Sequence, residues 1–178
     1  MSKGNSGLFH GTTGDQRQNG PEQIIASRTT GLDLREHPVT QKQLTSARQA
    51  KLRLKVEERT ATKAEYKALM WNKRFAKRRN TGVETFWRQE RARILNGQKP
   101  TRNWSAEQID DIIHSRIPRF EGQAIHGHHT YSASKYPHLA NHGEVIYPAT
   151  RREHHKGWHG GNYRKSKPGK RIRSIEEF

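Results

Sequence analysis

Eight of the eleven histidines in this 178-residue chain lie between residues 126 and 161. Two of them are adjacent in Gly127-His128-His129, and His154, His155 and His159 follow further on. A neutral imidazole can bind a divalent metal ion or accept a proton from water. The spacing suits one metal ion beside one general base, which is the chemistry that hydrolysis of a phosphodiester requires.

These two groups of histidines need different local structures to meet at one ion. Adjacent residues of a strand point to opposite faces, so His128 and His129 can serve one site only if the strand bends, which Gly127 permits. On a helix, His155 and His159 are four residues apart and share a face, although Gly157 between them weakens this inference. A strand and a helix would then close a three-histidine site with open positions, and we predict His129 as its base.

The composition indicates what such a site would act on. The chain has 34 lysines and arginines against 17 acidic residues, a net charge of +17, which predicts a polyanionic partner and favours nucleic acid over an anionic membrane. There is no cysteine, so disulfides, zinc–thiolate sites and thiol nucleophiles are excluded. A hydrophobic content of 30% and a mean hydropathy of −1.15 predict one small core and a sizeable disordered fraction.

No apolar leader and no run long enough for a membrane span is visible in the sequence. Export through the Sec route is therefore unsupported, and delivery by a larger secretion apparatus stays open.

The elements that must position the histidines follow from capping and turn signals. Residues 1–40 are rich in glycine and polar side chains, and we expect a flexible tail or linker there. Residues 41–100 carry most of the basic excess and are predicted to be helical. The basic run from Lys73 to Arg79 fits a solvated helix face and a direct DNA contact about equally well.

Several boundaries are predicted in more detail. We expect helices at residues 41–58, from Thr62 to a stop at residues 80–82, at residues 83–95, and from Ser105 onward. After Pro118 the pattern predicts a hairpin with an irregular loop, and the spacing of Thr150 and Glu153 predicts a last helix that carries His154 and His155.

At this point the sequence resembles a known family, the polymorphic-toxin nucleases of the HNH/endonuclease VII superfamily that are named for a Gly-His-His signature. The resemblance covers about Trp87 to Gly169. It rests on these motifs in this order: Trp104-Ser105, Gly122, Gly127-His128-His129, Tyr136-Pro137-His138-Leu139-Ala140, Pro148-Ala149-Thr150 with Glu153-His154, and His159-Gly160-Gly161-Asn162. It implies an α+β fold in which a helical N-terminal half packs on a small ββα-metal finger at residues 101–178, with a disordered N-terminal tail and a basic C-terminal tail.

The resemblance also implies roles for single residues. His128 would be a metal ligand and His129 the general base, and His159 with either His154 or His155 would complete the metal site. The Glu-His context favours His154, whereas four-residue helical spacing favours His155. The chain departs from the family pattern at Val145, where an asparagine is usual. The cations expected to contact phosphates are Arg151, Arg152, Lys156, Arg164 and Lys165.

The expected function is therefore a metal-dependent, largely sequence-nonspecific DNA endonuclease. The resemblance further implies an interbacterial toxin that is delivered into a target cell and neutralised by an immunity protein. Mg²⁺ is the expected ion, and histidine ligands would also accept Zn²⁺, Ni²⁺ or Mn²⁺. Two alternatives stay open: a non-catalytic basic protein that binds nucleic acid, and the same fold acting on RNA. Solvated histidines and a passive metal-binding tract are simpler interpretations of the same pattern.

Overall fold

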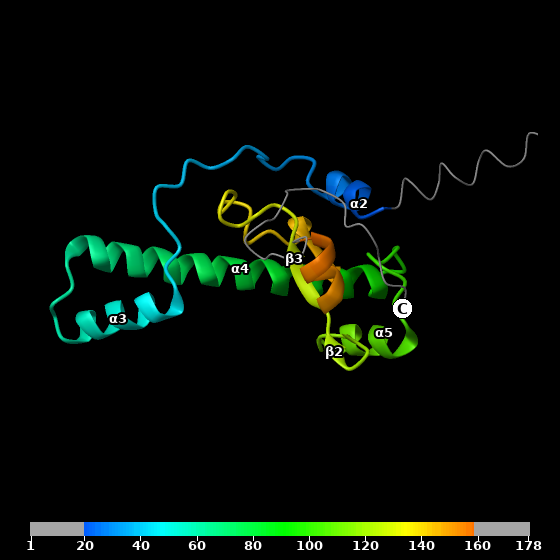
Figure 1. Ribbon diagram of the computed structural model, residues 1–178. Coiled ribbons are helices and arrows are strands. Elements are labelled where there is room, and N and C mark those ends of the chain that lie inside the picture. The colour runs from blue at the N-terminus through cyan, green and yellow to red at the C-terminus, as the bar shows by residue number, and fades with distance from the viewer. Residues whose placement is uncertain (1–19, 159–178) are drawn as a thin grey trace, which may run out of the picture.

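The computed structural model describes residues 20–158, and Figure 1 shows their arrangement around one long helix. The elements are α2 (Pro21–Arg28), α3 (Ser46–Glu57), α4 (Lys63–Leu95), α5 (Ala106–Ile113), β1 (Arg119–Phe120), β2 (Gln123–Ala124), β3 (His126–His129), η1 (Gly143–Val145), β4 (Ile146–Ala149) and η2 (Glu153–Trp158). Helices and two small antiparallel sheets confirm the predicted α+β class. Among the described residues, none of the helices has the length and apolar character needed to cross a membrane.

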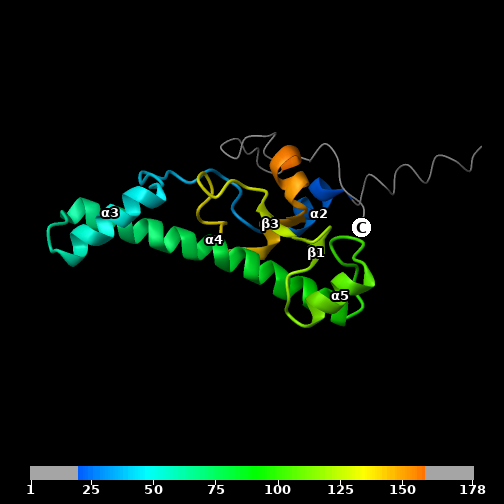
Figure 2. The same ribbon diagram turned by 60° about the horizontal axis from the view of Figure 1, so that its bottom comes forward.

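Helix α4 is the axis on which the other elements pack. It begins at a capping box in which Thr62 accepts from the backbone of Glu65 and the Glu65 side chain accepts from Thr62. Helix α3 packs beside its first half, while the β3–β4 hairpin and α5 pack along its second half (Figures 1 and 2). One element thus connects the basic N-terminal half to the segment that carries the histidines.

The predicted helix stop at residues 80–82 is wrong, because α4 continues through Gly82 without a break. A Cβ atom at Gly82 would overlap the carbonyl oxygen of Ala140 and would lie 3.3 Å from Nε2 of His129. Glycine stands here because the hairpin loop approaches the helix backbone closely. The two helices expected at residues 62–79 and 83–95 are therefore one.

The core lies between α4 and the β3–β4 hairpin. Phe86 of α4 is fully buried and packs with Tyr136, Leu139, Val145 and Ile146 from the hairpin and its loop. A second cluster joins Trp104, Ile112 and Ile125, and fixes α5 against the end of α4. The capping boxes predicted at Ser105 and at Thr150 are both present.

The N-terminal region needs one correction. We expected no regular structure before residue 41, yet Pro21–Arg28 form helix α2 and Ile25 packs against Tyr147 and Ala149 of β4. Proline at the first helical position supports this start. The part of the predicted flexible tail before residue 20 lies outside the described residues.

Candidate functional site

The Gly-His-His segment forms strand β3 of a regular antiparallel pair. His126, Gly127, His128 and His129 lie opposite the four residues of β4, from Ala149 back to Ile146, without a bulge. The bend expected at Gly127 is therefore absent. A Cβ atom at Gly127 would lie only 2.8 Å from a methyl carbon of Val83, so this glycine permits close packing on α4.

Regular pairing assigns the histidines to two faces. His126 and His128 share the face next to η2, because residues two apart on a strand point the same way. The ring centroid of His128 lies 4.9 Å from that of His154, and that of His126 lies 5.3 Å from His154. Nδ1 of His126 and Nδ1 of His154 are 3.2 Å apart. Three imidazoles thus meet between β3 and η2, and His128, 2% exposed, is the deepest.

His129 lies on the other face, toward α4. Its Nε2 lies 2.8 Å from the carbonyl oxygen of Ala140, and because a carbonyl can only accept, Nε2 must carry the proton. In the neutral ring, Nδ1 is then the nitrogen that can accept a proton. Burial is the main cause that lowers the pKa of His129 to about 4, with a smaller contribution from the charge of Arg79; the hydrogen bond to Ala140 opposes both.

The last helix is held by a buried ion pair. Arg102 donates to Glu153 at 2.7 Å, with side-chain exposures of 4% and 2%, and also to the carbonyl oxygen of Pro148. Glu153 also completes the cap of this helix by accepting from the backbone of Thr150. Because His154 follows Glu153 directly, this ion pair fixes the residue that carries the imidazole between η2 and β3.

A second buried carboxylate ties that ion pair to α4. Glu90 is fully buried and accepts from the backbone of Thr101, the indole of Trp104 and the guanidinium of Arg93. These bonds position the segment from which Arg102 reaches Glu153. Helix α4 therefore supports both groups of histidines, directly for His129 and through residues 101–104 for His154.

The other predicted site residues are placed as follows. His155 is partly exposed, and Arg151, Arg152 and Lys156 are exposed around the start of the last helix. His159, Arg164 and Lys165 lie outside the described residues. Of the predicted metal ligands, the structure brings together His128 and His154.

Two neighbours of the site were missed at the sequence level. The position of His126 beside the site could have been predicted, because a residue two positions before His128 on a strand shares its face. The position of Arg102 could not, because Arg102 meets Glu153 only through the tertiary fold.

The histidines that meet at β3 and η2 provide some, but not all, of the ligands that a divalent ion needs. Imidazole nitrogens are ligands for Zn²⁺, Ni²⁺ and Mn²⁺, and His128 and His154 lie side by side. Within residues 20–158, no group of three or more histidine, aspartate or glutamate side chains is arranged to hold a metal ion. The third predicted ligand, His159, falls beyond this range.

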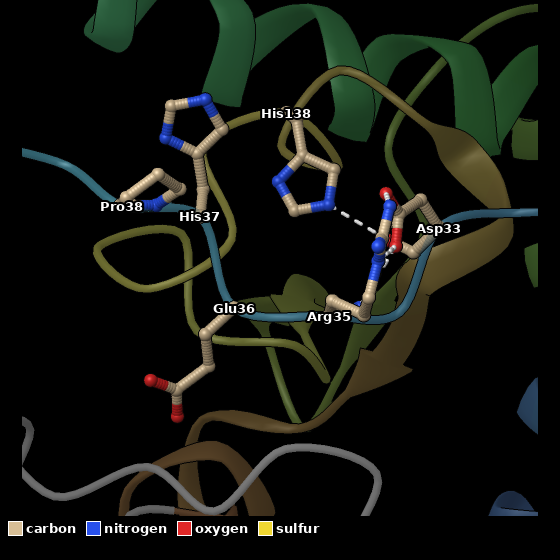
Figure 3. Close-up of a pocket in the computed structure, with 6 residues that line it drawn as sticks. All are labelled: Asp33, Arg35, Glu36, His37, Pro38 and His138. Atoms are coloured by element: carbon tan, nitrogen blue, oxygen red, sulfur yellow. Dashed lines mark hydrogen bonds and ion pairs between the residues drawn. The ribbon is translucent and has the colours of Figure 1, made fainter.

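Residues 33–38, which we call the strap, form hydrogen bonds with the loop between β3 and β4. The backbone of His37 donates to Lys135, and Nε2 of His138 donates to the carbonyl oxygen of Asp33 at 2.7 Å. An open cavity of about 430 Å³ lies between them, and the His37 and His138 rings are 5.6 Å apart. Figure 3 shows the residues that line this cavity. The strap thus supports the loop that carries Ala140, the acceptor of His129.

Comparison with known proteins shows a similarity to one family over part of the chain. No curated protein and no solved structure matches the chain. Residues 69–150 match the model of a family described as GHH signature containing HNH/Endo VII superfamily nuclease toxin. The match spans α4 from Leu69 onward, the Gly-His-His strand and its hairpin partner, and ends at the residue that caps the last helix. Over these elements, the chain is similar to the GHH-signature nuclease toxins of the HNH/endonuclease VII superfamily.

Proposed function

We propose that this protein is a metal-dependent, largely sequence-nonspecific DNA endonuclease that acts as a toxin. The proposal rests on one observation: the two adjacent histidines of β3 have different surroundings. One histidine of the Gly-His-His segment packs against His154, and its neighbour is hydrogen-bonded in the form of a proton acceptor. The similarity over residues 69–150 supports nuclease chemistry for this arrangement.

In the proposed reaction, Nδ1 of His129 takes the proton of the water that attacks phosphorus. The Ala140 carbonyl keeps the proton on Nε2 and fixes the ring orientation. His128, His154 and His159 would hold the divalent ion, with His155 as the alternative to His154. When bound, the ion would supply Lewis acidity for the charge that develops on the leaving oxygen. We expect Mg²⁺ in use.

Strand β3 lacks the bend that we expected to be necessary for His128 and His129 to serve one site, but their opposite orientations are compatible with this chemistry. The attacking and leaving oxygens lie roughly in line on opposite sides of phosphorus. A base and a ligand on opposite faces of one strand could therefore serve opposite sides of a phosphate at the strand's end. Arg151, Arg152 and Lys156 are exposed beside the last helix, where they would contact neighbouring phosphates.

Variants of the two adjacent histidines test the proposal. His129→Ala should keep the metal ion and lose about 10²- to 10⁴-fold in the rate of plasmid nicking, as expected for removal of a general base. His128→Ala should lose both metal and nicking. Metal content and nicking are measured on the same preparations, with and without chelator. Wild-type rates in both variants would refute the assignment.

Two further measurements separate the alternatives. Tight binding of plasmid without nicking, at every divalent ion tried, would favour the non-catalytic binding protein. Incubation with total RNA beside plasmid decides between RNA and DNA as substrate. The toxin role, with delivery into a target cell and an immunity partner, predicts that expression in a bacterial cytoplasm arrests growth and that His129→Ala does not.

A further inference from the structure

One side of α4 carries an uncompensated row of positive charge. Lys63, Lys67, Arg74 and Arg78 follow one another at spacings of four, seven and four residues, which places them along one line of the helix. The first three are exposed and Arg78 is partly buried. Between residues 66 and 83 the helix contains no aspartate or glutamate. We call these four residues the basic row.

The row has no counter-charge in the part of the chain that the structure describes. The ion pairs found in residues 20–158 use other cations, such as Lys55 with Glu65 and Arg93 with Glu90. Lys63 and Lys67, and Arg74 and Arg78, are like charges four residues apart, which disfavours a helix. A local conflict of this kind is expected where a sequence serves binding.

The row ends at the loop that holds the candidate base. Arg78 donates to the carbonyl oxygens of Pro137 and His138 and to Oδ1 of Asn141, all of them uncharged. Ala140, in the same loop, accepts from His129. A polymer lying along the row would therefore be held by the same rigid helix that fixes the base.

The chemistry of the row identifies the ligand. From Lys63 to Arg78 the helix rises by about 22 Å, and duplex DNA carries about one negative charge per 1.7 Å of its axis. Stacking of unpaired bases needs exposed aromatic rings. Two aromatic residues lie beside the row: Trp71 is only partly exposed with its ring stacked on Phe75 at 4.9 Å, and Tyr66 is 49% exposed. One exposed ring is fewer than the successive rings on which the bases of a single strand stack.

We infer that the basic row binds the phosphate backbone of duplex DNA and aligns it with the hairpin. This inference rests on the proposed function for the identity of the polymer, and it adds a contact surface on α4 to the cations beside the last helix. The row is sequence-independent in its chemistry, because it offers charge to phosphates and nothing that reads base edges.

The test compares two double variants that lose the same charge. Lys67→Gln with Arg74→Gln removes two charges from the row, whereas Lys73→Gln with Lys99→Gln removes two exposed charges that lie outside it. Binding of a short DNA duplex is followed by fluorescence anisotropy at several salt concentrations, with chelator present to prevent cleavage. The row variant should reduce the slope of log affinity against log salt by about two, since each phosphate contact contributes about 0.9.

The control variant should change that slope by less than about one. Equal reductions in the two variants would overturn the row as a specific contact. An equal loss of affinity for a single strand of the same length would overturn the assignment to duplex DNA. Thermal unfolding of each variant verifies that the fold is intact.

The outcome is independent of catalysis. His129→Ala should bind duplex with the wild-type salt slope. If the row variant shows the reduced salt slope but the wild type never nicks plasmid, the proposed endonuclease activity is refuted and the binding role of the row is supported. If plasmid is nicked and the row variant keeps the wild-type slope, the row fails and the endonuclease stands.

Discussion

The two faces of strand β3 differ in what holds their histidines. On the face toward α4, His129 is fixed by one hydrogen bond to a loop carbonyl that a glycine lets approach the helix. On the face toward η2, His128 packs against His154, which follows directly after the buried ion pair of Arg102 and Glu153. One face depends on close backbone approach, and the other depends on buried charge.

This difference has a physical consequence. Adjacent residues of a strand can be given separate environments, because the pleat directs them to different neighbours. Damage on one face should therefore leave the other nearly intact, provided that the hairpin stays folded. Each of the following experiments alters one face, or a distant region, and measures what happens to the rest.

The largest effect is expected from the histidine on η2. His154→Ala should lose metal and reduce plasmid nicking by at least about 100-fold, because even residues that only support a metal ligand contribute 10- to 100-fold. His155→Ala is the matched control and should retain most of both, since the structure brings His154, and not its neighbour, against His128. The reverse ranking in metal content would show that His155 is the ligand.

The buried ion pair should dominate stability on the same face. Arg102→Ala leaves the carboxylate of Glu153 buried without its cation, which is expected to cost about 3 to 5 kcal/mol in the free energy of unfolding. Chemical denaturation measures this loss. Arg116→Ala, which removes an exposed cation paired with Asp110 and Asp111, should produce a much smaller change. Similar losses in the two variants would mean that the buried pair contributes no more than a surface pair.

The face toward α4 is tested by Gly82→Ala. Alanine favours a helix by about 1 kcal/mol over glycine, yet its methyl group would overlap the Ala140 carbonyl, and such overpacking costs about 1 to 3 kcal/mol. We expect a net loss of stability together with slower nicking, because His129 loses its acceptor position. Thr81→Ala, one position earlier, should be neutral or stabilising. A stabilised Gly82→Ala protein with full activity would show that the contact with Ala140 is not needed.

Much of the architecture was predictable because it depends on local signals. The capping boxes at Thr62, Ser105 and Thr150 each begin a helix, and the hairpin pattern after Pro118 yields β3 and β4. These features are determined by side chains three residues apart or by short alternation, so the sequence alone carries them.

The features that were not predicted depend on contacts between residues that are distant in sequence. Gly82 was interpreted as a helix stop because its reason for being glycine is a carbonyl almost sixty residues away, at Ala140. Helix α2 was missed because it depends on packing of Ile25 against β4. The ion pair of Arg102 and Glu153 likewise joins segments that are distant in sequence. Tertiary contacts of this kind leave no periodic pattern in the chain.

The smallest effect is expected at the far end of α4, where Glu65 caps the helix and contacts Lys55. The hydrogen bond from Lys55, followed by that from the backbone of Thr62, lowers the pKa of Glu65 from 4.5 to about 2. Because the pKa of this carboxyl is lower in the folded protein, its contribution to stability is complete above about pH 5 and is lost as the pH falls toward 2. Glu65→Gln should therefore lower the melting temperature modestly at pH 7 and converge with the wild type near pH 2.

Glu57→Gln is the control for this variant, since Glu57 is exposed on α3 and forms no ion pair within the described residues. It should follow the wild-type melting curve at every pH. Glu65→Gln should also nick plasmid at the wild-type rate at temperatures where it is folded, because neither face of β3 depends on this end of the helix. A loss of nicking without unfolding would mean that α4 transmits strain from its start to the hairpin, and the two faces could then no longer be treated as locally determined.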